Sequence, residues 1–152
     1  MNTLACGCPG AHVRTIERTE TNQHEPQGKL ASELRQWPTQ LHLVPPTAPY
    51  LQNAHLLIAA DCVPFAYADF HRDFIKGRVL VNACPKLDDT SPYVDKLAAI
   101  IARNDIQSVT VTIMEVPCCR GLAMLAQQAI AQSGKEVPLE IAVIGIDGER
   151  RR

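Results

Sequence analysis

Short apolar runs alternate with longer amphipathic segments along most of this chain. Residues 56–60, 78–83 and 108–116 are three such runs, and residues 139–146 form a fourth. Their lengths are typical of single buried strands. Helices are expected between them, at 65–75 before Gly77, from Ser91 and Pro92 onward, and at 122–132 before Gly134. The alternation predicts an α/β fold, with a mainly parallel sheet of four to five strands wrapped by helices (three layers, flavodoxin-like or related).

The first thirty residues follow a different pattern. Residues 1–29 hold the turn-like stretch Cys6-Gly7-Cys8-Pro9-Gly10, followed by a polar segment without apolar periodicity, which we interpret as a linker. Residues 30–152 are predicted to form a single α/β domain. Its first part is expected to contain a short helix at 30–36, a short strand at 41–44 and a helical turn at 50–54.

Charge and composition narrow the range of partners. The formal net charge is −1 and only 5% of residues are aromatic, which argues against nucleic acid or an anionic membrane as a partner. The longest apolar stretch, 56–68, is interrupted by Asp61 and Pro64 and is too short to span a membrane. With no secretory signal at the start, a cytoplasmic, reducing location is expected, and a homo-oligomer stays open. The terminal run 150–152 is expected to be a frayed end.

Cysteines stand at the ends of three consecutive predicted strands. Cys62 follows the run 56–60, Cys84 follows 78–83, and the pair Cys118-Cys119 follows 108–116. Because parallel strands end at the same edge of a sheet, these four thiols are expected to meet there, at the edge where such sheets bind ligands. Four converging thiols predict a soft-metal site.

An iron–sulfur cluster suits this set of thiols best. Four thiolates commonly hold one cluster, and prolines beside Cys84 and Cys118 would stiffen the ligand loops. Adjacent cysteines chelate one ion poorly, and the chain lacks the C-x₂-C pairs that are typical of structural zinc. We therefore predict a cluster, 4Fe–4S in type, on Cys62, Cys84, Cys118 and Cys119, with Cys8 as a candidate further ligand. Its predicted role is electron transfer with a redox partner protein.

Two other functions stay open from the sequence. Cys118 or Cys119, at a helix N-terminus, could serve a metal-free thiol redox enzyme or sensor. A zinc-stabilised interaction domain is the second alternative. Whether the chain is an enzyme, for example a component of an oxidoreductase, is not decided, and no catalytic residue is assigned. A cysteine phosphatase is excluded for the strand-end cysteines, because no arginine lies six residues after any of them. A nucleotide site has little support, because a Gly-rich phosphate loop is missing.

Several longer motifs resemble a known family. They include residues 34–50, the segment Ala60-Asp61-Cys62-Val63-Pro64, the segment 84–89 (Cys-Pro-Lys-Leu-Asp-Asp) and the segment 114–119 (Met-Glu-Val-Pro-Cys-Cys). Over residues 30–149 the chain resembles prokaryotic 4Fe–4S ferredoxins and iron–sulfur-binding oxidoreductases. It lacks their N-terminal two-cluster module and has Arg120 where a small residue is common, so it is similar to their carboxyl-terminal domain standing alone. The resemblance implies cluster binding and a separate ferredoxin or oxidoreductase as the electron partner.

Overall fold

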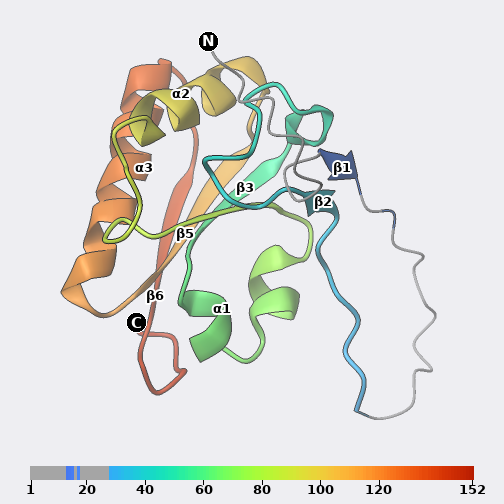
Figure 1. Ribbon diagram of the computed structural model, residues 1–152, viewed down its shortest axis with the longest axis vertical. Helices are drawn as coiled ribbons and strands as arrows, with labels where there is room; N and C mark the ends of the chain where they lie inside the picture. Colours follow the sequence, from blue (N-terminus) through green and yellow to red (C-terminus); the bar gives the residue numbers. More distant parts are fainter. Residues whose placement is uncertain (1–12, 16, 18–27) are drawn as a thin grey trace.

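Four parallel strands form the central sheet of the computed structural model, which describes residues 13–15, 17 and 28–152 (Figure 1). In the order β4-β3-β5-β6, the strands are β4 (Val79–Ala83), β3 (His55–Ala60), β5 (Ser108–Met114) and β6 (Leu139–Ile144). A separate antiparallel pair joins β1 (Arg14–Thr15) to β2 (Gln36–Trp37). The predicted three-layer α/β fold is confirmed, with four strands in its parallel sheet.

The two central strands explain the continuous apolar runs in the sequence. Leu56, Leu57, Ile58 and Ala59 of β3 are all fully buried, and β5 is buried from Val109 to its end. Strands inside a parallel sheet are covered on both faces, so neither face needs polar side chains. The core therefore lies around β3 and β5.

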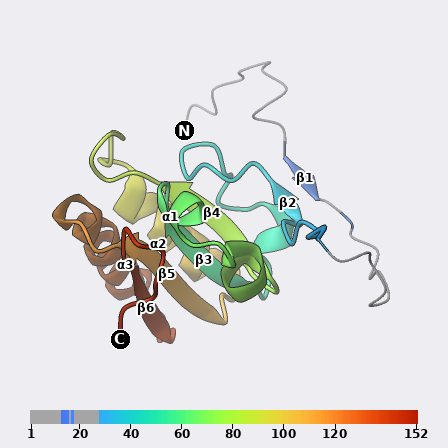
Figure 2. The same ribbon diagram turned by 90° about the horizontal axis from the view of Figure 1, so that it is seen from below.

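Helices cover both faces of the sheet. The helices α2 (Tyr93–Arg103) and α3 (Arg120–Ser133) pack against each other on one side of it (Figure 2). The short helix α1 (Val63–Ala66) and the π-helical turn η3 (His71–Ile75) connect β3 to β4. This connection runs across the sheet in the direction opposite to the connections through α2 and α3. Because crossovers between parallel strands are right-handed, that connection takes the other face.

Glycine ends two of these helical segments as the sequence predicted. Gly77 and Gly134 adopt positive φ angles of 74° and 72°, which a residue without Cβ accepts readily. The serine cap predicted for α2 is wrong. The Ser91 hydroxyl donates to the Asp89 carboxylate, and Pro92 holds the cap position without a side-chain hydrogen bond.

Three further expected elements are wrong, in each case because backbone groups find other partners. Residues 30–36 are not helical, and the Gln36 side chain donates to the Leu80 carbonyl at 2.6 Å beside β4. Residues 41–44 form a turn in which two N–H groups donate to the Gln40 carbonyl. The expected helix 65–75 is interrupted at Tyr67, which has an extended backbone, and helical structure resumes at η3.

Strand register brings the carboxyl ends of the sheet together. Ala60 pairs with Ala83 across β3 and β4, and Met114 pairs with Ile144 across β5 and β6. In Figure 1 this edge faces the bottom of the molecule, where α1 and the loop after β6 lie. Within the described ranges, no helix has both the length and the apolar content to cross a membrane.

Candidate functional site

A hollow of about 260 Å³ opens at the carboxyl edge of the sheet, and all four predicted ligand cysteines line it. Its lining residues lie at or just after the ends of β3, β4 and β5, and one lies in the loop after β6. They are Ala60, Asp61, Cys62, Cys84, Pro85, Met114, Val116, Cys118, Cys119 and Ile146. The structure thus brings Cys62, Cys84, Cys118 and Cys119 together. Cys6 and the candidate ligand Cys8 lie outside the described residues. The role of the four cysteines as ligands remains a prediction.

Topology places the hollow at the switch point of the sheet. The chain passes from β3 to β4 on one side and then crosses back to β5 on the other side of β3. Loops therefore diverge between the carboxyl ends of β3 and β5, which is where open α/β sheets bind their ligands. Cys62 follows β3, and Cys118 and Cys119 follow β5, so three of the four thiols border this crevice.

The two cysteines after β5 differ in exposure. Both belong to the 3₁₀ turn η4 (Pro117–Cys119), which leads directly into the fourteen-residue helix α3. Cys118 is exposed and Cys119 is buried. Cys62, at the start of α1, is exposed like Cys118. The N-terminus of α3 carries a partial positive charge that favours thiolates or an anionic cluster beside it.

Burial raises the pKa of the Cys119 thiol, and the neighbouring Cys118 and Cys62 raise it further, while a hydrogen bond involving the Met114 backbone opposes them. Without a metal, Cys119 is therefore a protonated thiol at neutral pH. A bound iron would displace that proton, because thiolates are the ligands that soft metals bind. The same raised pKa disfavours Cys119 as the attacking thiolate of a metal-free redox enzyme.

Cys84 is held by a carboxylate that the sequence reasoning did not single out. Its N–H donates to Oδ2 of Asp88 at 2.9 Å, and its carbonyl accepts the Asp88 N–H at 2.9 Å. The same Oδ2 accepts the hydroxyl of Tyr93, whose side chain is fully buried. Burial and then Asp88 raise the pKa of Tyr93, so its hydroxyl stays protonated and donates. The four-residue spacing from Cys84 to Asp88 was the available signal for this closed loop.

A second polar cluster holds the loop after β6 against the hollow. Glu115 lies between Met114 and Val116, which both line the hollow, and its carboxylate accepts the N–H of Ile146 at 3.2 Å. Arg151 donates to Glu115 at 2.9 Å and to Asp147 at 3.1 Å. The expected fraying of residues 150–152 is therefore wrong for Arg151, and also for Arg150, which pairs with Glu140. Carboxylates on the neighbouring strand and loop hold both arginines.

The described residues contain no group of three His, Cys, Asp or Glu side chains placed to hold a single metal ion. This finding gives no support to a metal centre on the four cysteines, and the cluster stays a prediction. In a cubane each thiolate binds a different iron, so the four sulfurs stand farther apart than the ligands of one ion.

Comparison with known proteins identifies the fold family. The model of a family described as a Rossmann-like domain matches residues 48–151. The chain belongs to this family. This Rossmann-like domain is also 33% identical over 116 residues to an uncharacterised protein of Archaeoglobus fulgidus, a match that covers 76% of this chain and 81% of that protein. No solved structure matches it.

The resemblance to ferredoxins and iron–sulfur oxidoreductases is therefore wrong as a family assignment. The matching family model is the Rossmann-like domain, and no ferredoxin or iron–sulfur family was found. The motifs that carried the resemblance include the loops at strand ends, whereas the family match spans the strands and helices of the whole sheet. Ligand chemistry in this Rossmann-like domain has to be argued from its own residues.

The dinucleotide fingerprint is missing at the first turn of this Rossmann-like domain. From the end of β3 into the first residues of α1 the chain reads Asp61-Cys62-Val63-Pro64, without the glycines that let a backbone approach a pyrophosphate. Instead, a thiol and a carboxyl occupy the turn. The Asp61 carboxyl accepts the side-chain amide of Asn82 at 2.7 Å, which ties this turn to the end of β4.

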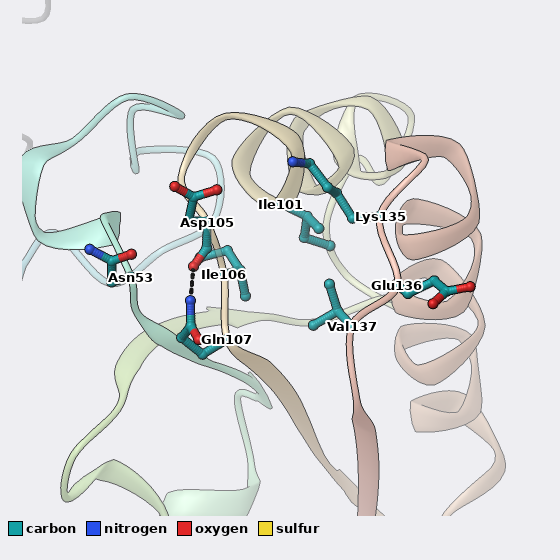
Figure 3. Close-up of a pocket in the computed structure, with 8 residues that line it drawn as sticks. All are labelled: Asn53, Ile101, Asp105, Ile106, Gln107, Lys135, Glu136 and Val137. Atoms are coloured by element: carbon teal, nitrogen blue, oxygen red, sulfur yellow. Dashed lines mark hydrogen bonds between the residues drawn. The ribbon is translucent and has the colours of Figure 1, made fainter.

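A second hollow, of about 250 Å³, lies at the opposite end of the strands (Figure 3). Its lining residues are Asn53, Ile101, Asp105, Ile106, Gln107, Lys135, Glu136 and Val137. Figure 3 shows the Glu136 carboxylate pointing away from the apolar space between Ile106 and Val137. The Gln107 amide is already hydrogen-bonded to the Asp105 carbonyl at 2.7 Å. This hollow contains no cysteine and lies away from the edge where parallel sheets bind ligands.

Proposed function

We propose that this protein binds an iron–sulfur cluster, 4Fe–4S in type, through Cys62, Cys84, Cys118 and Cys119 and exchanges single electrons with a redox partner protein. The observation that carries the proposal is the single hollow lined by all four cysteines. Four thiolates are the usual ligand set of such a cluster. One electron passes between the cluster and the partner's cofactor, and no chemical group is transferred.

The surroundings of the hollow suit a cluster. Apart from the cysteines and Asp61, its lining is apolar, with Met114, Val116 and Ile146 among it. Apolar walls limit the access of water, which influences the potential and stability of a cluster. The N-terminus of α3 favours the negative charge of the cluster, and the Asp88 hydrogen bonds fix the backbone of Cys84. A reducing cytoplasm, where thiols remain free to bind iron, is the proposed location.

Anaerobic reconstitution tests the proposal. The purified chain is incubated with ferrous iron and sulfide, and bound iron and sulfide are counted after desalting. The expected result is about four of each per chain, following the composition of a cubane, with an EPR signal appearing on reduction. A chain that retains no sulfide contradicts the proposal.

Single cysteine-to-alanine variants assign the ligands. Alanine keeps the buried position of Cys119 apolar, so folding, checked by circular dichroism, is retained. We expect Cys62→Ala, Cys84→Ala, Cys118→Ala and Cys119→Ala each to lose most of the cluster. Cys8→Ala is the comparison variant: a full cluster in it leaves the four residues of the hollow as the ligands. An unchanged cluster in Cys84→Ala refutes that ligand assignment.

The same preparations distinguish the alternatives. One colourless zinc per chain after aerobic purification would favour the zinc-stabilised domain. A metal-free protein in which Cys118 is alkylated rapidly at neutral pH would favour the thiol redox enzyme or sensor. Either result, together with failure of reconstitution, replaces the cluster.

A further inference from the structure

The second hollow, at the amino ends of the strands, has walls from three loops that are distant in the sequence. One of these loops precedes β3, one precedes β5 and one precedes β6. Hydrogen bonds hold the first two loops together. The Asn53 N–H donates to the Asn104 carbonyl and the Gln107 N–H donates to the Ala54 carbonyl, both at 2.9 Å. These walls are therefore fixed without a ligand, which lowers the cost of binding one.

Two opposite charges at this hollow have no partner within the described part of the chain. The side chains of Asp105 and Lys135 form no ion pair or hydrogen bond there, either with each other or with another residue. Figure 3 shows Lys135 extending over Ile101, with its ammonium group on the side of Asp105. The carboxylate of Glu136, the third charged lining residue, points away, and Arg103 does not line the hollow. One anion and one cation therefore face this space.

Between these charges and the strands, the lining is aliphatic. Ile101 and Ile106 are buried and Val137 is half-buried, and all three line the hollow. None of the described lining residues is aromatic, so a nucleotide base or another flat ring would find no stacking partner. The volume of about 250 Å³ is below the range of roughly 300–1,000 Å³ that is usual for larger ligands. A ligand of this hollow is therefore small and aliphatic.

Two lining residues hold polar side chains at positions where the backbone favours glycine. Asn53 and Asp105 have φ angles of 55° and 49°, in the left-handed region. Asparagine and aspartate enter this region more readily than other residues with a Cβ, but still at a cost that glycine avoids. Backbone strain of this kind is concentrated at ligand sites. The Asn53 amide has no hydrogen-bond partner among the described residues, so it is a further group that a ligand can use.

We propose that this hollow binds a free aliphatic amino acid. Lys135 pairs with its carboxylate, Asp105 pairs with its ammonium group, and its side chain lies against Ile101, Ile106 and Val137. A zwitterion pairs with both charges of the hollow at once, whereas a simple anion or cation leaves one of them without a partner. The site lies at the opposite end of the strands from the cysteines, so this inference does not depend on the proposed cluster.

Titration of the full chain with L-leucine, followed by backbone amide NMR, tests the inference. We expect saturable shifts at residues around the hollow, with a Kd of about 1 mM or lower. Three further probes each lack one group of leucine: isocaproate lacks the ammonium group, isopentylamine lacks the carboxylate, and glycine lacks the aliphatic side chain. Each is expected to bind at least about tenfold more weakly. No saturable shift with leucine, or equal binding of any of these probes, overturns the proposal.

Matched variants locate the two charges that hold the ligand. Asp105→Asn and Lys135→Gln each remove one charge at an exposed position, and asparagine still tolerates the positive φ of residue 105. Each variant is expected to bind leucine at least about tenfold more weakly. Glu136→Gln, in the same hollow but pointing away, and Lys76→Gln, an exposed lysine elsewhere, are the controls, and they should bind leucine as the parent does. Equal affinities in the test and control variants overturn the proposal.

The incomplete probes distinguish direct contact from a change in the shape of the hollow. Because isocaproate has no ammonium group, Asp105→Asn should weaken the binding of leucine but not that of isocaproate. Lys135→Gln should likewise weaken the binding of leucine but not that of isopentylamine, which has no carboxylate. Variants that weaken the incomplete probes as much as leucine would show that these residues shape the hollow without contacting the ligand's charges, and would overturn the proposal.

Discussion

Replacement of Asp88 by alanine tests whether one carboxylate holds the Cys84 loop. Oδ2 of Asp88 accepts the Cys84 N–H at 2.9 Å and also accepts the Tyr93 hydroxyl. Both donors lose their partner in Asp88→Ala. Tyr93 is fully buried, so water does not replace the carboxylate at its hydroxyl, whereas Cys84 is only half-buried.

The size of the effect follows from these two hydrogen bonds. A hydrogen bond to a charged group contributes about 1.5–3 kcal/mol, and an unpartnered buried donor costs about 1–3 kcal/mol. Because Asp88 is partly exposed, we take the low end for each bond and expect Asp88→Ala to lower the free energy of unfolding by about 3 kcal/mol. Asp88→Asn keeps an oxygen but loses the charge, so about half of that loss is expected.

Urea unfolding, monitored by circular dichroism, measures these changes in the free energy of unfolding, with the slope of that free energy against urea concentration the same in all variants. Asp95→Ala is the control: Asp95 is exposed and accepts one hydrogen bond, from Gln132 at 2.7 Å, so a loss below about 1 kcal/mol is expected. Tyr93→Phe removes the buried hydroxyl, and in that background Asp88→Ala should cost less, by about 1–2 kcal/mol. Equal losses in Asp88→Ala and Asp95→Ala, or additive losses with Tyr93→Phe, would refute the reasoning.

Three further predictions concern other parts of the molecule. Gly148→Ala should lower the free energy of unfolding by about 1–3 kcal/mol, since Gly148 has a φ of 86° and its Cβ would lie 2.8 Å from the Ala66 carbonyl oxygen. Gly77→Ala, with a φ of 74° but open space, should cost less, and equal losses in urea unfolding would contradict this. The hydrogen bond from Arg151 lowers the pKa of Glu115, and hydrogen bonds from the Glu149 N–H and from Arg151 lower the pKa of Asp147. Because both pKa values are lowered in the folded state, this cluster stabilises the fold above the ordinary carboxyl pKa of about 4, and the contribution is lost as the pH falls. Arg151→Gln should therefore be less stable than the parent at pH 7, and the difference should shrink below about pH 4; a constant difference would disprove the assignment. Asn104→Asp should destabilise the fold by about 3 kcal/mol or more at pH 7, because the buried Asn104 amide donates to the Pro46 and Ile100 carbonyls and a carboxylate would face both. Acid should restore part of the loss by protonating this carboxylate. A loss of stability that does not change with pH would contradict the prediction.

Strands and helices that bury an apolar face were predictable from the sequence. The strand β4 (Val79–Ala83) lies within the predicted run 78–83, and Gly134 ends α3 as expected. Residues 30–54 were not predictable in the same way, because their structure depends on partners distant in the sequence. Gln36, for example, reads as an ordinary helical residue, yet its buried side chain donates to the Leu80 carbonyl.

The candidate site was predictable where topology determines position. Parallel strands and right-handed crossovers place every strand-end cysteine at one edge, so the grouping of Cys62 and Cys84 with the pair after β5 follows from the strand assignments. Side-chain partners such as Asp88 and Arg151 depend on loop conformation. Local patterns do not encode that conformation, so these partners emerged only with the structure.

Topology and chemistry have separate origins in this Rossmann-like domain. The crossing from β4 back to β5 opens a crevice between β3 and β5 whatever residues follow the strands. Glycines at the first turn would let a backbone approach phosphates there, but Cys62 and Pro64 occupy this turn and give it a thiol on a stiffer loop. Cys118 and Cys119 add thiols at the next strand end, beside the N-terminus of a long helix. The same positive helix end that favours phosphate in other proteins of this architecture would here favour the anionic cluster that we propose, so the residues after the strands, and not the topology, decide which ligand such a crevice takes.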